Sequence, residues 1–121
     1  VLKKDYEQMC KDYPNLKYIV STKRDIISTS VNDLCGFMMH KGVFTSSAIY
    51  HIDDIVDRVG GGDAFIAGVI YGILQGKNDF DALTFGCAYS VLKHTVQGDA
   101  NLFSADEIET FVKNGVSRIN R

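Results

Sequence analysis

The sequence is poor in several residue types, and each shortage narrows the class of protein. It has no tryptophan, one proline and three cysteines in 121 residues. Cys10, Cys35 and Cys87 are widely spaced and form neither a CxxC pair nor a Cys/His zinc pattern, so we expect reduced thiols in a cytoplasmic protein. The three histidines are isolated from one another, and we expect structural roles for them.

Long uncharged runs and an excess of charge are also missing. The longest uncharged runs, Ala64–Gln75 and Ala82–Leu92, are far shorter than the ~20 residues that span a bilayer. Charged residues interrupt the N-terminus, so no signal peptide is predicted. The formal net charge is −2 with scattered lysines and arginines, which gives no electrostatic basis for binding nucleic acid or an acidic membrane. The length suits one domain, and the start at Val1 suggests a fragment.

Strand-like segments come first in the chain and long helices come last. An amphipathic pattern predicts a helix at Leu2–Tyr13, and β-prone segments follow within Tyr18–Ile52. Further helices are expected at Ala64–Leu74, Ala82–Lys93 and Ala105–Lys113. The first two of these helices are almost free of charge, so we expect them to be buried on most sides and to pack against more protein.

Local signals mark interruptions, turns and caps along the chain. Lys23-Arg24-Asp25 reads as a charged interruption between strands, and Val31-Asn32-Asp33 reads as a turn. Lys41-Gly42 lies between two apolar segments and predicts a β-hairpin. Ser104, with Glu107 three residues later, predicts a capping box at the start of the last helix.

The segment most informative about chemistry is Gly60-Gly61-Gly62-Asp63, at the start of an apolar helix. Glycines let backbone N–H groups converge without obstruction, and the first N–H groups of a helix favour an anion. A carboxylate at the edge of that anion site can accept the proton of a hydroxyl that attacks a phosphoryl group. The alternative is a glycine-rich turn in which Asp63 only caps the helix.

The string around this turn resembles the second signature of the PfkB family of sugar kinases, usually written D-T-x-G-A-G-D-x-F. The matching residues are Asp57, Gly60, Gly62, Asp63 and Phe65. Gly61 stands where the signature has alanine, which is a conservative change. Arg58 stands where threonine is usual, which is a real departure.

A second stretch of the sequence indicates one subgroup of this family. Residues 93–102, which include Lys93-His94 and Gly98-Asp99, look like the late loop of bacterial 2-keto-3-deoxygluconate kinases, a PfkB subgroup in which Arg58 also fits. Taken alone, Gly98-Asp99 is ordinary turn chemistry and the stretch reads as a surface turn. Beside the glycine signature, it favours this subgroup.

The resemblance implies a set of site residues and cofactors. Asp63 would be the catalytic base, Gly60, Gly61 and Gly62 the anion hole, and Asp99, with Asp63, the contact to the sugar acid. ATP and Mg²⁺ would be the cofactors, and Asp57 matches a position that supports a monovalent cation such as K⁺. The nucleotide would be lined by Asn32, Gly36, Gly60, Gly62, Cys87 and Ala88.

The resemblance also implies the fold class and the extent of the domain. We expect an α/β piece, the C-terminal portion of a ribokinase-like α/β/α sandwich. Residues 1–121 would form a single partial kinase domain that lacks the N-terminal portion and the lid. The partners would be a sugar acid and ATP, and a homo-oligomer is compatible with the pattern.

Two alternatives remain at this point. One is another PfkB kinase, acting on ribose, fructose or a nucleoside. The other is a non-catalytic nucleotide-binding or interaction fragment of the same fold, because fold alone does not fix activity.

Overall fold

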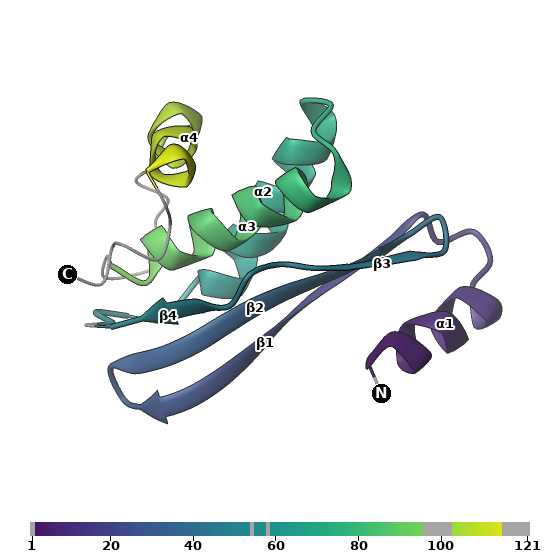
Figure 1. Cartoon of the computed structure of the whole chain (residues 1–121), viewed down its shortest axis with the longest axis horizontal. Coiled ribbons are helices and arrows are strands. Elements are labelled where there is room, and N and C mark those ends of the chain that lie inside the picture. Colours follow the sequence, from purple (N-terminus) through teal and green to yellow (C-terminus); the bar gives the residue numbers. More distant parts are fainter. Residues whose placement is uncertain (1, 54, 58, 96–102, 115–121) are drawn as a thin grey trace.

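The computed structural model describes residues 2–53, 55–57, 59–95 and 103–114, and it confirms an α/β architecture. In this part of the chain a four-stranded antiparallel sheet carries helices on both faces (Figure 1). The elements are α1 (Leu2–Asp12), β1 (Tyr18–Ser28), β2 (Val31–His40), β3 (Val43–Ser46), β4 (Tyr50–Ile52), α2 (Gly61–Leu74), α3 (Asp79–Lys93) and α4 (Ala105–Lys113). None of these helices is long and apolar enough to cross a membrane.

Strand β2 is the centre of the sheet. It pairs with β1 along its length, with β3 near its end and with β4 near its start. The hairpin predicted at Lys41-Gly42 is confirmed, and both residues have positive φ, 53° and 77°. This backbone twist matches that of the flanking strands, which is why two-residue hairpins favour it.

Two local predictions were wrong. Val31-Asn32-Asp33 is not a turn but the start of β2, where Asn32 pairs with Ile26 of β1 and with Ile52 of β4. Lys23-Arg24-Asp25 does not interrupt the strand but lies within β1. In both cases pairing with neighbouring strands outweighs the local preference of polar residues for turns.

Helices α2 and α3 cover one face of the sheet and form the main core. Leu34 and Met38 of β2 pack there against Phe65 of α2 and Leu83 of α3, all at most 2% exposed. The two helices touch backbone to backbone: a Cβ on Gly68 would lie 2.7 Å from the Gly86 Cα. The sequence uses glycine here because any side chain would push the helices apart.

One face of α2 is not covered by the described chain. Ile66, Ile70 and Leu74 follow one another at helical spacing and are 40%, 51% and 77% exposed. An uncharged helix was expected to be buried on most sides, and the described residues bury only the face toward the sheet and α3.

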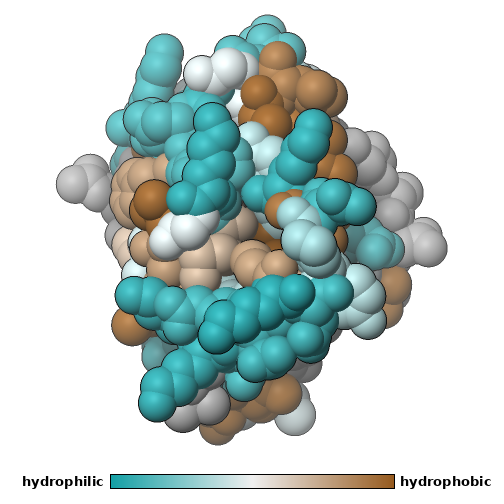
Figure 2. All heavy atoms as spheres, turned by 90° about the vertical axis from the view of Figure 1, so that its right-hand side faces the viewer, coloured by the Kyte–Doolittle hydropathy of each residue, from teal (hydrophilic) through white to brown (hydrophobic). Residues whose placement is uncertain are grey.

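Within the part of the chain that the structure describes, the opposite face of the sheet is covered only at one end, by α1. Tyr6 of α1 packs against Ile19 and Met39 there, in a small separate cluster. The remaining side chains of α1 are mostly exposed. Figure 2 faces this end of the molecule, where hydrophilic side chains predominate and hydrophobic atoms show between them.

The last helix, α4, packs against α3 (Figure 1). Its predicted capping box is confirmed: the Glu107 N–H donates to Ser104 Oγ at 3.2 Å, and the Ser104 N–H donates to Glu107 Oε1 at 3.0 Å.

Candidate active site

The glycine turn forms the N-terminal end of α2. Gly60 is the N-cap residue and has a left-handed backbone, with φ 81°. Glycine adopts this conformation without the steric cost that a Cβ would bring. The Gly60 carbonyl accepts the N–H of Ala64 at 2.9 Å, so the helix proper starts with Gly61, Gly62 and Asp63.

The backbone at the start of α2 has the chemistry that suits an anion. A Cβ built on Gly62 would meet no atom of the described residues within 4 Å, so the described part of the chain leaves this position open. Asp63 is exposed and is the acidic residue of the first turn. The first N–H groups of a helix lack intrahelical partners and carry the positive end of its dipole. The residues present therefore fit a transferring phosphoryl group with a carboxylate at its edge.

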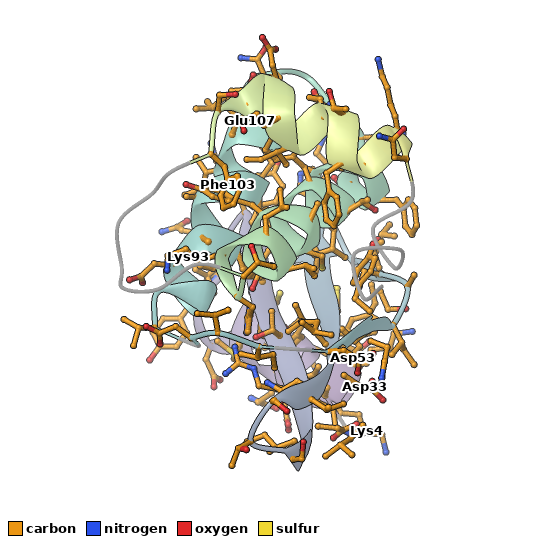
Figure 3. The ribbon with its side chains drawn as sticks, turned by 90° about the vertical axis from the view of Figure 1, so that its left-hand side faces the viewer. Lys4, Asp33, Asp53, Lys93, Phe103 and Glu107 are labelled. Carbon is orange, nitrogen blue, oxygen red and sulfur yellow. The ribbon has the colours of Figure 1, made fainter. Side chains whose placement is uncertain are left out.

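Lys93 holds the turn from the end of α3. Its Nζ donates to the carbonyl of Val59 at 2.9 Å, directly before Gly60, although the residue is only 2% exposed. Figure 3 shows Lys93 at the end of α3, beside the start of α2.

His94 holds the same segment through both its backbone and its ring. Its carbonyl accepts the N–H groups of Val56 and Asp57 at 2.9 and 3.4 Å. Its ring Nδ1 lies 2.6 Å from the Ser90 carbonyl, and its Nε2 lies 3.2 Å from Arg24 Nη2. A carbonyl only accepts and a guanidinium only donates, so the ring is the neutral tautomer with its proton on Nδ1.

Asp57 shapes the chain that leads into the turn. Its Oδ1 accepts the Val59 N–H at 3.0 Å, a local turn typical of aspartate. Among the described residues no group of three or more His, Cys, Asp or Glu side chains could hold a metal ion. Asp57 as a support for K⁺ therefore stays a prediction.

The residues predicted to line the nucleotide lie in the core. Asn32, Cys87 and Ala88 are 0% exposed, and a Cβ on Gly36 would lie 2.8 Å from Cys87 Sγ. Burial raises the pKa of the Cys87 thiol to about 12. The structure gives these residues a packing role between sheet and helices, so contact with a nucleotide stays a prediction for them. Only Gly60 and Gly62 of that set border the open helix end.

Asp99 and Arg58 lie outside the described residues. The structure follows the late loop only as far as Thr95, whose hydroxyl donates to the Leu92 carbonyl at 2.6 Å.

The structure adds three residues around the turn that sequence reasoning did not assign to the site, namely Arg24, Lys93 and His94. Arg24 reaches the turn from β1, where it pairs with Leu34 and so shares the face of the sheet that α2 and α3 cover. One signal was available for Lys93: it is a charge at the end of a helix that is otherwise uncharged for eleven residues, Ala82–Leu92.

The fold is that of part of a ribokinase-like α/β kinase, with a glycine-rich turn at the N-terminus of α2. The sequence matches the pfkB family carbohydrate kinase profile over residues 26–106, more than half of the chain. The chain belongs to the PfkB family of carbohydrate kinases.

Known relatives agree with this assignment. The chain is 40% identical to a PfkB family carbohydrate kinase from Listeria grayi, covering 89% of this chain and 34% of that one with a TM-score of 0.86. It is 38% identical to 2-dehydro-3-deoxygluconokinase from Thermotoga maritima, covering 93% of this chain and 34% of that one, also with a TM-score of 0.86. It is 33% identical over 82 residues to 2-dehydro-3-deoxygalactonokinase from Haloferax volcanii, covering 68% of this chain and 26% of that protein. The chain thus spans about a quarter to a third of the length of these relatives.

Proposed function

We propose that this chain is the C-terminal catalytic part of an ATP-dependent kinase that phosphorylates a hydroxyl of a sugar acid. The observation that carries the proposal is the exposed carboxylate of Asp63 at the open, glycine-lined N-terminus of α2. Membership of a carbohydrate kinase family supports the class of reaction.

The proposed mechanism assigns one task to each part of the turn. The acceptor hydroxyl is a poor nucleophile, and Asp63 accepts its proton as the hydroxyl oxygen attacks the terminal phosphorus of ATP. The bond from this phosphorus to the bridging oxygen breaks at the same time, and ADP leaves. The N–H groups at Gly60, Gly61 and Gly62 stabilise the negative charge that develops on the phosphoryl oxygens. Mg²⁺ would supply neutralisation of the negative charge on the phosphates of the nucleotide.

The proposed substrate is 2-keto-3-deoxygluconate, phosphorylated at its 6-hydroxyl. The late loop at residues 93–102 supports it, as does the name of the Thermotoga maritima relative. The Haloferax volcanii relative is named for the galacto epimer, so the configuration of the sugar acid is the finer part of the proposal. Asp99 would bind a distal hydroxyl of this substrate, and K⁺ near Asp57 would assist.

The test compares two Asp→Asn variants in the full-length kinase. Asp63→Asn should lower kcat by about 10²–10⁴-fold, the usual contribution of a positioned acid or base, while ATP binding measured by calorimetry stays nearly unchanged. Asp81→Asn makes the same chemical change in the first turn of α3 and should leave kcat within a few fold of wild type.

Other outcomes would decide against the proposal. If Asp63→Asn kept wild-type kcat, Asp63 would be only a helix residue. The wild-type enzyme should be assayed on 2-keto-3-deoxygluconate, its galacto epimer, ribose and fructose. A preference for ribose or fructose would overturn the sugar-acid assignment but keep the kinase.

A further inference from the structure

We propose that Lys93 and His94 are positioning residues that hold the glycine turn in the geometry needed for phosphoryl transfer. They lie together at the C-terminal end of α3, and both bind the segment that runs into the turn. This inference rests on the proposed function, because it concerns the same anion site. Neither residue is placed against substrate, so both act through the backbone that they hold.

The burial of Lys93 is the first argument. An ammonium group is strongly favoured in water, and a lysine is almost never fully buried unless its charge is engaged. Lys93 is 2% exposed and donates to the Val59 carbonyl. That carbonyl belongs to the peptide that joins Val59 to Gly60, so the bond fixes the chain where the left-handed glycine begins.

His94 supplies the second argument, because it fixes the turn on two sides. Its carbonyl accepts the N–H groups of Val56 and Asp57 before the turn. Its ring lies against Gly61 within the turn, since a Cβ there would be 2.8 Å from Cε1. The ring cannot rotate away cheaply, because Ser90 and Arg24 bind its two nitrogens.

The pair also connects the turn to the late loop. Lys93 and His94 directly precede residues 95–102 in the sequence. The end of α3 therefore anchors the anion site and starts the loop proposed to bind the sugar acid. Catalysis depends on holding the reacting groups in the correct relative positions. A displacement of about 1 Å can lower the rate about a hundredfold.

The experiment compares Lys93→Met with Lys77→Met in the full-length kinase. The first variant removes the donor to Val59 and keeps an unbranched apolar chain. The second is a matched lysine change far from the turn, where Lys77 pairs with Glu109 at 2.9 Å. We expect Lys93→Met to lower kcat about tenfold or more, with KM for ATP changed less than about twofold. Lys77→Met should keep wild-type kcat.

Hydrogen–deuterium exchange provides a second measurement that does not depend on activity. In Lys93→Met the amides of Val59 and Ala64, which donate to Asp57 Oδ1 and to the Gly60 carbonyl, should exchange faster than in wild type, and in Lys77→Met they should not. Equal exchange of these amides in both variants would overturn the proposal. A wild-type protein without sugar kinase activity would overturn the proposed function, and the exchange comparison would still decide whether Lys93 holds the turn.

A pair of variants tests His94 separately. In His94→Gln the amide oxygen can still accept from Arg24, whereas His94→Leu loses the bonds of both ring nitrogens. We expect kcat to be highest in wild type, lower in His94→Gln and lowest in His94→Leu. The amides of Val56, Asp57 and Ala64, which are hydrogen-bonded around the turn, should lose protection from exchange in the same order. A purely structural histidine would give a different result. Both variants would then lose the same amount of kcat and of melting temperature, and the amides of the turn would be no less protected from exchange, relative to the rest of α2, than in wild type.

Discussion

The ring of His94 occupies the space that the side chain of any larger residue at position 61 would fill. A Cβ on Gly61 would lie 2.8 Å from His94 Cε1 and 3.4 Å from Arg24 Nη2. The related signature usually has alanine at this position, and here the imidazole takes the place of its methyl group. The size of the side chain that position 61 can accept therefore depends on the residue at position 94, directly after α3.

Gly61→Ala and His94→Ala should be non-additive. Gly61→Ala should lower the free energy of unfolding by about 1–3 kcal/mol through overpacking. In a His94→Ala background the same change should cost less, with a coupling of at least about 0.5 kcal/mol. Urea denaturation of the four proteins measures the cycle. Additive effects would mean that the ring moves aside freely.

Gly62→Ala provides the control for that cycle. A Cβ on Gly62 meets no atom of residues 2–53, 55–57, 59–95 and 103–114 within 4 Å, and alanine is about 0.5–1 kcal/mol better than glycine within a helix. Gly62→Ala should therefore leave the stability unchanged or raise it slightly, while it narrows the anion site and lowers kcat. A destabilised Gly62→Ala protein would contradict the open helix end.

Asp99→Ala tests the proposed role of the late loop in the full-length enzyme. Losing a hydrogen bond between a charged acceptor and a sugar hydroxyl costs about 1.5–3 kcal/mol, or roughly a 10- to 150-fold increase in KM for the sugar acid. KM for ATP should change little. Unchanged steady-state kinetics on 2-keto-3-deoxygluconate would remove the reason for choosing this subgroup.

The three thiols should differ in reactivity. Burial raises the pKa of Cys87 to about 12, so almost none of it is thiolate near neutral pH. Cys10 and Cys35 are only partly buried. Iodoacetamide at about pH 8 should label Cys10 and Cys35 first, as read by peptide mass spectrometry, and Cys87 only after denaturation. Early labelling of Cys87 would show that the core between sheet and helices opens readily.

His51 should make stability depend on pH. Its Nδ1 lies 2.6 Å from Asp33 and its Nε2 lies 3.0 Å from Asp53, carboxylates that Figure 3 shows near each other. The hydrogen bond to Asp33 raises the pKa of His51 above 6.5. A raised histidine pKa stabilises the fold below the unfolded-state value, and this contribution is lost as pH rises through the folded value.

The measurement for His51 compares wild type with His51→Gln. The stability difference between them should be larger at about pH 5.5 than at about pH 8.5. An NMR titration of the His51 ring should give a midpoint above that of a model peptide. A difference in stability that did not change with pH would mean that the two carboxylates do not raise the pKa of His51 in the folded protein.

The long helices and the hairpin could be predicted from sequence because their signals are local. The uncharged run after Asp63, the Lys41-Gly42 dipeptide and the spacing of Ser104 and Glu107 each act over a few residues. The turn predicted at Val31-Asn32-Asp33 was wrong for the converse reason. Its residues gain partners in β1 and β4, and no local pattern reports a strand on each side.

The contacts around the glycine turn could not be predicted for a related reason. Lys93 is 34 residues from Val59, and His94 is 70 residues from Arg24. Which distant groups meet depends on how α3 lies across the sheet, and that follows from packing of the whole core. The sequence was enough to locate Asp63 and the glycines of the turn, whereas the groups that contact the turn from β1 and from the end of α3 are brought there by packing.

The contact of Gly68 with Gly86 has a consequence for motion. Helices that touch backbone to backbone cannot tilt or slide without a clash, whereas helices separated by long side chains can shear past one another. We therefore expect α2 and α3 to move together as one body, with Asp63 in the first turn of α2 and Lys93 at the end of α3. Any domain closure during turnover has to leave the distance between these two ends unchanged.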